Sequence, residues 1–545
     1  MKITLYFGTN NFEGIGKVLI IPATAESIGD GAFTGLLELE KIDFSENDKI
    51  NEVPLFMFAG CSNLQEVIFS ENITKIGEWS FRECKSLKKI VIPDSVEEIG
   101  RGAFYKTGLE EVTFPKNDKF IKINSYTFSS TLIKNLEIPN SVVKIDYEAF
   151  SIIKINKLTI GDNLKEIDIS SFKNANIGDI EISDKNTFLK KYNSCIYSND
   201  YKKIFVMGNN LQAFNLHSSL EEFNCYFPNN IEIDNMNFPK KIKNISNLSE
   251  YPNIKNITID ENNPYLTCVD GVIYTKKDDN GISNIINAIN SVENLILRDN
   301  LNENIGTIKS ISGFSSSKLK SIDLAGTSIE TVTDQTFYEC KKLENIVFSN
   351  SLKTVKNQAF TNTLIKSIVI PEGTTTLETL AFFANGKLEN VKLPSTLKNV
   401  NNFFPRCEAI KNVEIAENDK FSTDGIMIFN KDKSILIAAP YFKEGMKIPS
   451  TVKEINQFAL SYLNYKDISL SIDIPNSIEV IHLSAFHYSE SLIEVNIQSG
   501  ILKIEGGAFE SCNNLKKINI DKPKNSISGA PWGAPKGILA VNWKK

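Results

Sequence analysis

The feature that most constrains this chain is an 18-residue pattern that recurs along its length. Residues 87–104 read LKKIVIPDSVEEIGRGAF and residues 133–150 read IKNLEIPNSVVKIDYEAF. Residues 343–360 read LENIVFSNSLKTVKNQAF and residues 492–509 read LIEVNIQSGILKIEGGAF. The shared form is L-x-x-I-x-I-P-x-S-V-x-x-I-x-x-x-A-F. Such recurrence indicates a repeat architecture, which grows by adding units and needs no single closed core.

The aromatic residue that closes each unit gives the period of the repeat. Successive closing phenylalanines within each run lie 22 to 25 residues apart. They are Phe33, Phe58, Phe81, Phe104, Phe128, Phe150 and Phe172, then Phe337, Phe360 and Phe382, then Phe486 and Phe509. A period of about 20–29 residues, with Leu and Ile at L-x-x-L-x-L spacing, is typical of leucine-rich repeats.

One unit is enough to predict the local structure. Ile90 and Ile92 alternate with Val91, so the two isoleucines point to the same face of a short strand. Pro93 ends that strand, because proline has no N–H to donate to a neighbour. Phe104 then fills the interior of the coil. Since no unit can bury its apolar face alone, stacked neighbours are expected to share one core of parallel strands.

A second pattern interrupts the repeat. Residues 193–207, 261–275 and 417–440 each read as strand, polar turn and strand, which predicts β-hairpins. We therefore expect an α/β solenoid that coils to the right, with a period of about 23 residues and inserted hairpins. A repeat-like segment follows each hairpin, which favours one continuous solenoid over a separate central domain.

Four segments follow from these patterns. We expect an N-terminal repeat block at 1–182, degenerate repeats with hairpin insertions at 183–310, a C-terminal repeat block at 311–520 and a C-terminal cap or tail at 521–545. The tail is expected to cover the apolar face that the last coil of an array exposes.

The sequence resembles the BspA-type leucine-rich repeats. The resemblance rests on IPDSVEEIGRGAF (92–104), IPNSVVKIDYEAF (138–150), the Cys-x-x-Leu at 84–87 and the hairpin VDGVIYTKKD (269–278). It covers roughly residues 15–520 and implies an adhesin or another binding protein. The resemblance carries over no ligand and no contact residue.

The tail SISGAPWGAPKGILAVNWKK (526–545) is similar to the ends of repeat proteins from low-GC Gram-positive bacteria and their phages. This second resemblance implies an alternative, a receptor-binding protein of a phage or phage-tail-like particle. Residues 1–8 lack the apolar run of a secretory signal. That absence fits a particle that assembles in the cytoplasm, and it also fits a secreted protein whose signal has been removed.

The composition excludes several classes of partner. The formal net charge is -6, so no basic excess attracts nucleic acid. No apolar segment reaches the roughly 20 residues that cross a bilayer. We therefore expect neither nucleic-acid binding nor membrane insertion, and the oligomeric state is left open.

The residues that usually carry catalysis are sparse. The chain has three histidines, His217, His482 and His487, and none stands in a Ser-His-Asp or Cys-His pattern. Its eight cysteines contain no C-x-x-C pair, and five of them follow a closing aromatic by three residues, where a small buried side chain is expected. We expect no enzyme, no metal and no cofactor. A repeat scaffold of a toxin or enzyme stays as a further alternative.

The outward residue of each strand is the predicted ligand face, because it lies between the two inward apolar positions. The candidates are Val91, Thr113, Glu137, Thr159, Glu181, Asp323, Val347, Val369 and Glu414. The same row includes Ile68, Thr258, Lys392, Asp473 and Asn496. The other interpretation of this row is a solvated β-face without a ligand.

The functional prediction is adhesin-like recognition of a protein or glycan receptor on a cell surface. A protein of this kind is located on the cell surface or secreted. In the phage alternative, it is part of a tail particle.

Overall fold

The computed structural model describes residues 4–5, 16–209, 215–228, 231–246, 248–250, 254–315, 317–465, 468–534 and 540–544. Most of the N-terminal stretch 1–8 lies outside these residues. The chain forms two compact units, residues 1–247 with 259–263 and residues 248–258 with 264–545. The four segments predicted from the sequence do not coincide with these two units and stay a prediction.

Each regular coil of the first unit contains two short strands. In one coil these are β8 (Lys89–Val91) and β9 (Glu98–Ile99), and a turn that starts at Pro93 separates them. Ile90 and Ile92 are buried while Val91 is exposed, as the alternation predicts. We call the first strand of each coil the row strand and the second the short strand.

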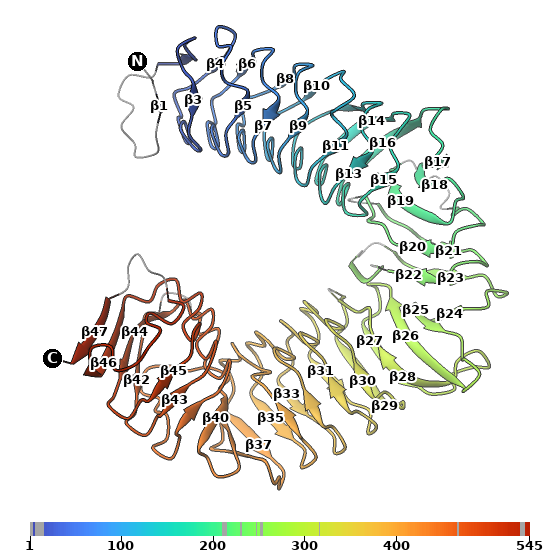
Figure 1. Cartoon of the computed structure of the whole chain (residues 1–545). Coiled ribbons are helices and arrows are strands. Elements are labelled where there is room, and N and C mark those ends of the chain that lie inside the picture. The colour runs from blue at the N-terminus through green and yellow to red at the C-terminus, as the bar shows by residue number, and fades with distance from the viewer. Residues whose placement is uncertain are drawn as a thin grey trace. The chain divides into compact units, whose positions relative to one another are not determined.

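Row strands of neighbouring coils pair in parallel, and so do short strands (Figure 1). The row strands of the first unit form three sheets: β2 (Val18–Ile20), β4 (Lys41–Asp43) and β6 (Glu66–Ile68); β8 and β10 (Glu111–Thr113); and β12 (Asn135–Ile138), β14 (Lys154–Ile160) and β16 (Asn176–Ile182). The short strands are β3 (Ser27–Ile28), which pairs with β1 (Thr4–Leu5), and then β5 (Glu52–Val53), β7 (Lys75–Ile76), β9, β11 (Lys122–Ile123), β13 (Lys144–Ile145) and β15 (Glu166–Ile167).

A hairpin follows the regular coils of the first unit. Strands β17 (Leu189–Tyr192), β18 (Cys195–Ser198) and β19 (Lys203–Met207) pair antiparallel. Strand β19 then pairs in parallel with β20 (Glu222–Phe223), which pairs with β22 (Asn244–Ile245). The predicted hairpin is thus present, and its last strand rejoins the stack of short strands. Strand β21 (Met236–Phe238) also belongs to this unit.

The second unit repeats this organisation with two hairpins among its described residues. Its row strands are β27 (Asn294–Arg298), β29 (Ser321–Gly326) and β31 (Asn345–Val347); β33 (Ser367–Val369), β35 (Asn390–Leu393) and β37 (Asn412–Ile415); and β42 (Leu470–Ile474), β44 (Leu492–Ile497), β46 (Lys517–Pro523) and β47 (Ala540–Lys544).

The hairpins of the second unit also continue into stacks of short strands. The first is β24 (Leu266–Val269), β25 (Val272–Thr275) and β26 (Ile282–Ala288), followed by β28 (Thr307–Ile311), β30 (Thr331–Val332), β32 (Thr354–Val355), β34 (Thr376–Leu377) and β36 (Asn399–Val400). The second is β38 (Phe421–Thr423), β39 (Ile428–Asn430) and β40 (Ile435–Ala438), followed by β41 (Glu454–Ile455), β43 (Val480–Ile481) and β45 (Lys503–Ile504). Strand β23 (Ile257–Ile259) lies where the two units meet in the sequence.

A buried asparagine precedes each hairpin and joins it to the coil before. Asn186 donates two hydrogen bonds from Nδ2, to the backbone oxygens of Gly161 at 2.8 Å and Leu164 at 3.0 Å. Its Oδ1 accepts the backbone N–H groups of Phe188 and Leu189, both at 2.9 Å. One side chain thereby forms hydrogen bonds with four backbone groups of a turn, where no neighbouring strand is present to bind them.

The closing aromatics form the core, as the period predicts. Phe81, Phe104 and Phe128 are fully buried. The ring of Phe104 stacks on the ring of Phe81 with centroids 5.3 Å apart, and on that of Phe128 at 5.4 Å. Aromatic pairs favour such offset stacking at this separation. The rings therefore give each coil a fixed contact with its neighbour.

The prediction of an α/β fold is wrong. The described residues contain no α-helix, and their one helical element is the 3-10 turn Leu248–Glu250. The segments around the closing aromatics are turns that hydrogen-bond from coil to coil. The N–H of Phe81 donates to the oxygen of Ala103, and that of Glu83 donates to the oxygen of Tyr105, both at 2.8 Å. Glu83 also has a positive φ of 63°, which a right-handed helix does not allow.

The described residues of the C-terminal tail continue the repeat. Trp532 follows Phe509 by one repeat, is 1% exposed, and accepts the N–H of Phe509 on its backbone oxygen at 3.0 Å. Its ring lies 6.3 Å from that of Trp543 on β47. Trp532 therefore occupies the place of a closing aromatic.

Candidate functional site

The outward row lies where the sequence predicts it, on the row strands. Val91, Val347 and Val369 are 65%, 52% and 60% exposed. Thr113, Glu137, Glu181 and Glu414 are also exposed, whereas Thr159 and Asp323 are half-buried. These valines are exposed apolar side chains in sheets that charged residues border. A ligand that covers them displaces water without breaking hydrogen bonds between water and the protein.

The parallel register brings members of the row side by side. Thr113 pairs with Val91, and Thr159 pairs with both Glu137 and Glu181. In the second unit, Asp323 pairs with Val347, Val369 with Lys392, and Lys392 with Glu414. Each sheet thus presents a short line of side chains one strand spacing apart, about 4.8 Å. The candidates of the first unit are distributed over two sheets, and those of the second unit over two others.

Most charges along these strands are paired with the next coil. Lys89 contacts Glu111 at 2.7 Å, and Lys157 contacts Glu181 at 2.8 Å. The hydrogen bond from Lys157 to the Glu181 carboxylate raises the pKa of that amine. Such exposed pairs add little stability and leave a neutral surface. Glu137 differs, because among the described residues no partner faces its carboxylate.

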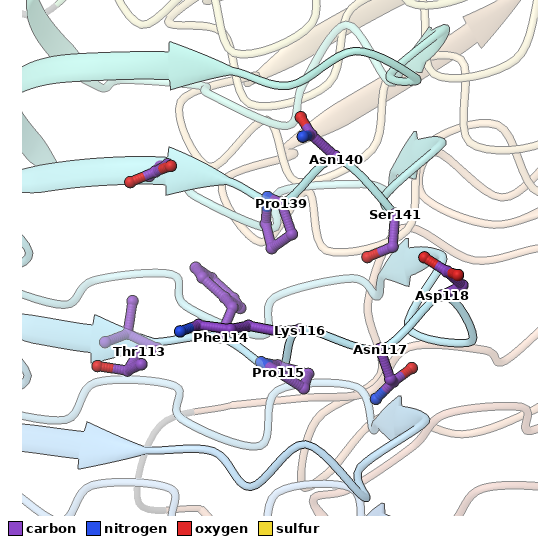
Figure 2. A pocket seen from close by; sticks show the side chains of 11 residues that line it. Thr113, Phe114, Pro115, Lys116, Asn117, Asp118, Pro139, Asn140 and Ser141 are labelled. Atoms are coloured by element: carbon purple, nitrogen blue, oxygen red, sulfur yellow. The ribbon is translucent and has the colours of Figure 1, made fainter.

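Glu137 lies at a hollow where two sheets of row strands part (Figure 2). Strand β10 belongs to one sheet and β12 to the next. The hollow has a volume of about 480 Å³, within the range of small-ligand sites. Its lining comprises Val112, Thr113, Phe114, Pro115, Lys116, Asn117, Asp118, Glu137, Pro139, Asn140 and Ser141.

The loop after β10 shapes one wall of the hollow. Asn117 holds this loop to the preceding coil, donating from Nδ2 to the oxygens of Asp94 and Val96, both at 2.7 Å. Phe114 stacks on Phe120 beneath it, with ring centroids 5.9 Å apart. The wall is therefore fixed by a half-buried amide and an aromatic pair, so the hollow exists before a ligand arrives.

The opposite wall follows β12. Figure 2 shows Pro139 and Ser141 pointing toward the loop that holds Pro115 and Lys116, whereas Asn140 points away from it. Asn140 accepts the backbone N–H of Asp162 instead, at 3.0 Å. The hydroxyl of Ser141 is buried and, among the described residues, has no hydrogen-bond partner.

Further hollows also open on the row. One of about 320 Å³ includes Glu181, one of about 600 Å³ includes Asp473, and one of about 450 Å³ includes Asn496. Row residues predicted from the sequence lie in all of these hollows, whereas the other residues of their walls were not predicted. Lys116 and Ser141 were missed, although the five-residue loop motif KNDKF at 116–120, which resembles ENDKF at 417–421, marks such a loop.

The cysteines are structural. Cys61, Cys84, Cys407 and Cys512 are buried, and each Sγ donates to the backbone oxygen of the closing aromatic one coil earlier, at 3.0 to 3.2 Å. Burial raises the pKa of Cys407 and of Cys512 to about 12. Thiols held in this way are protonated and unreactive near neutral pH. The described cysteines form no disulfide.

The histidines occupy separate places. His217 stacks on Tyr201 with centroids 4.1 Å apart, and His482 contacts Glu454 at 2.9 Å through Nε2. His487 packs among aromatic rings, 5.9 Å from Tyr462. No group of three or more metal-ligating side chains occurs among the described residues. Within the same part of the chain, no helix has the length and apolarity needed to span a bilayer.

The fold and its outward row define the class: a solenoid of leucine-rich repeats with a preformed surface along its strands. The sequence pattern described as BspA type leucine rich repeat region, in six copies, matches residues 7–124, 80–203, 121–247, 300–435 and 442–530. The chain belongs to this family. The family resemblance seen in the sequence is therefore confirmed.

Solved structures with a similar fold come from several bacteria. A leucine rich cell surface protein from Faecalibacterium prausnitzii has 20% identity and a TM-score of 0.33, over 74% of this chain and 88% of that one. A leucine-rich repeat protein from Bacteroides ovatus has 19% identity and a TM-score of 0.28, over 97% and 92%. The pneumococcal vaccine antigen PcpA has 14% identity and a TM-score of 0.25, over 99% and 82%. No curated protein matches the chain.

Proposed function

We propose that this chain is a non-catalytic binding protein that recognises a protein or glycan receptor on a cell surface through its row strands, as an adhesin does. We further propose that it is located on a cell surface or secreted. The observation that carries the proposal is the hollow between β10 and β12. Thr113, Lys116, Glu137 and Ser141 all line it, and among the described residues none of their side chains has a partner.

Several polar side chains that line the hollow have no hydrogen-bond or ion-pair partner among the described residues. Elsewhere on the row, Lys and Glu of neighbouring coils neutralise each other, as Lys157 and Glu181 do at 2.8 Å. The hollow is lined by hydroxyl groups, an amine and a carboxylate together with Pro115 and Pro139. A few convergent polar groups beside an apolar wall are the usual composition of a ligand site. Hydroxyl and amide groups of a glycan or a peptide loop match these donors and acceptors.

A binding experiment with cells tests the function. Fluorescently labelled protein is added to a panel of animal and bacterial cells, and the bound fluorescence is measured against concentration. Saturable binding to an animal cell type supports the adhesin proposal, and prior treatment of the cells with protease or glycosidase separates protein from glycan receptors. Saturable binding to bacteria alone supports instead host recognition by a phage or phage-tail-like particle. Absence of saturable binding to every cell type contradicts both.

A further inference from the structure

Arginine is rare in this chain and is concentrated on aromatic rings. Of the 60 basic residues, four are arginine: Arg82, Arg101, Arg298 and Arg406. Three of these, Arg82, Arg101 and Arg406, lie over aromatic rings in the turns that surround closing aromatics. A guanidinium is planar and weakly hydrated, so it stacks on a ring where an ammonium prefers water. A lysine, Lys106, also lies over a ring of these turns, 5.2 Å from the ring centre of Tyr105.

Arg101 lies against two aromatic rings, one in each neighbouring coil. Its guanidinium carbon lies 5.8 Å from the ring centre of Trp79 and 5.2 Å from that of Tyr126. The indole of Trp79 lies against Gly102, because a Cβ at that glycine would be 2.2 Å from Cε3 of the indole. Gly102 also has a φ of +62°, which favours glycine on its own. A larger residue at position 102 would therefore displace the indole.

Tyrosines extend this cluster across adjacent coils. Tyr105 meets Trp79 edge to face at 5.6 Å, and Tyr147 meets Tyr126 edge to face at 5.4 Å. Tyr147 is 45% exposed, while Trp79, Tyr105 and Tyr126 are half-buried. We define the aromatic–arginine surface as Trp79, Arg82, Arg101, Tyr105, Tyr126 and Tyr147. It lies on the turns, whereas the hollow of the proposed function lies on the row strands.

The charges of this surface are only partly satisfied. Arg82 is paired with Glu83 at 3.0 Å. Among the described residues, no carboxylate lies within ion-pair distance of Arg101. The ring centres of Trp79 and Tyr126 are 6.2 Å apart, so both rings lie toward the same side of the guanidinium, and the N–H edge of this exposed side chain stays available to a partner. An edge of this kind matches the two oxygens of a carboxylate.

Tryptophan, tyrosine and arginine are also the three residue types that dominate the energetic centres of protein interfaces. We propose that the aromatic–arginine surface docks an acidic segment of another protein. A carboxylate of that segment pairs with Arg101, and an adjoining apolar side chain packs on Trp79 and Tyr126. This surface is independent of the hollow, so the chain has two separate places of contact.

The second unit carries a smaller version of the same arrangement. Arg406 lies 5.9 Å from the ring centre of Phe383, whose ring meets that of Tyr462 at 5.1 Å. Tyr462 stacks on Tyr488 at 6.0 Å. The recurrence in a separate unit indicates that arginine-on-aromatic packing is a regular use of these turns.

Peptide binding tests the proposal. The full chain is titrated at physiological salt with labelled 15-residue peptides that combine Asp or Glu with Leu, Pro and Tyr, and with the same peptides carrying Asn or Gln in place of the acids. The expected result is binding of acidic peptides at least tenfold tighter than binding of their amide counterparts. Equal affinity for the two sets, or no binding of either, would overturn the proposal.

Substitutions connect the binding to the surface. Arg101→Ala is expected to weaken acidic-peptide binding at least tenfold, and Arg101→Lys severalfold, because lysine keeps the charge and loses the planar edge. Arg298→Ala is the matched control and is expected to change nothing, since Arg298 is on a row strand and paired with Asp323 at 3.4 Å. Trp79→Ala is expected to act like Arg101→Ala, with circular dichroism as the check of folding. The two Arg101 variants decide the outcome if the Trp79 variant does not fold.

One result would assign a different kind of partner to the aromatic–arginine surface. If a sulfated polysaccharide such as heparin binds in an Arg101-dependent way and the acidic peptides do not, the partner is a sulfated glycan and the proposal of a protein segment is wrong. If acidic-peptide affinity is unchanged in Arg101→Ala, the proposal is equally overturned. Failure of the cell-binding experiment leaves these outcomes unaffected, because the peptide titration measures the effect of Arg101 directly and needs no cell receptor.

Discussion

The rings of Phe360 and Phe382 lie almost parallel, with centroids 4.9 Å apart and planes 4° apart. The two residues belong to neighbouring coils, and both side chains are fully buried. On its other side, Phe360 stacks on Phe337, also at 4.9 Å. Removal of this one ring therefore takes contacts from two coils at once, and the backbone of the adjacent short strands prevents the gap from closing.

Phe360→Ala is accordingly expected to destabilise the chain by about 3–5 kcal/mol, the range found for buried aromatic residues. Thermal or urea unfolding followed by circular dichroism measures this change. Val369→Ala is the matched control, because Val369 is 60% exposed in the adjoining coil and its loss is expected to stay within about 0.5 kcal/mol. Equal stability of the two variants would refute the role of the ring.

Asn418→Ala is expected to destabilise the hairpin that follows it. The Asn418 amide donates to the oxygens of Ser395 at 2.8 Å and Leu397 at 3.2 Å, and accepts the N–H groups of Lys420 and Phe421. Alanine would leave these groups without a partner, and each such buried group costs about 1–3 kcal/mol.

Hydrogen exchange of the backbone in β38–β40 measures that local effect. Faster exchange is expected there in Asn418→Ala, with little change in distant coils, because each repeat contacts only its neighbours. Asn345→Ala serves as the control, since Asn345 is an exposed asparagine on a row strand. Unchanged exchange in the hairpin would show that the amide does not hold it.

The buried thiols are expected to resist alkylation and disulfide exchange in the folded chain. Burial raises the pKa of Cys407 and Cys512 to about 12 and that of Cys268, which is half-buried, to about 11. At pH 8 the folded protein should react slowly with a thiol reagent, Cys268 first, and fast after unfolding. Rapid reaction of Cys407 or Cys512 in the native state would contradict this.

The same shifts set a dependence of stability on pH. Because the folded-state pKa of these thiols lies above the unfolded value of about 8.5, the native state holds the protons more tightly. The stabilisation is complete below that value and is lost as the pH rises toward 12. The free energy of unfolding should therefore fall over this alkaline range, and less steeply in Cys512→Ala.

The sequence predicts the repeated parts of this fold well, because each prediction depends on one local rule. The closing aromatics mark the core, and the alternation around Val91 identifies the outward row. The prediction of an α/β fold is wrong because the segments around the closing aromatics form turns and not helices. Their hydrogen bonds run to the next coil, and a positive φ at non-glycine positions such as Glu83 is not readable from residue type.

The candidate site was predictable only in part, for a similar reason. Thr113 and Glu137 follow from the alternation of the strands. The hollow they share depends on where two sheets part and on a loop anchored by Asn117, which are tertiary features. Trp79 and Arg101 are 22 residues apart in the sequence and lie in neighbouring coils. Their contact depends on how these coils align in space, which is a tertiary feature.

The most direct test of the account is the affinity of Thr113→Val/Glu137→Gln protein for the cell type that binds the wild type. The double variant removes a hydroxyl and a charge from the hollow without changing side-chain volume by much. Glu111→Gln is the control, because Glu111 is an exposed glutamate on β10 that pairs with Lys89 at 2.7 Å and does not line the hollow. We expect at least tenfold weaker binding for the double variant and unchanged binding for the control. Identical binding curves for all three proteins would contradict the hollow as the site of recognition.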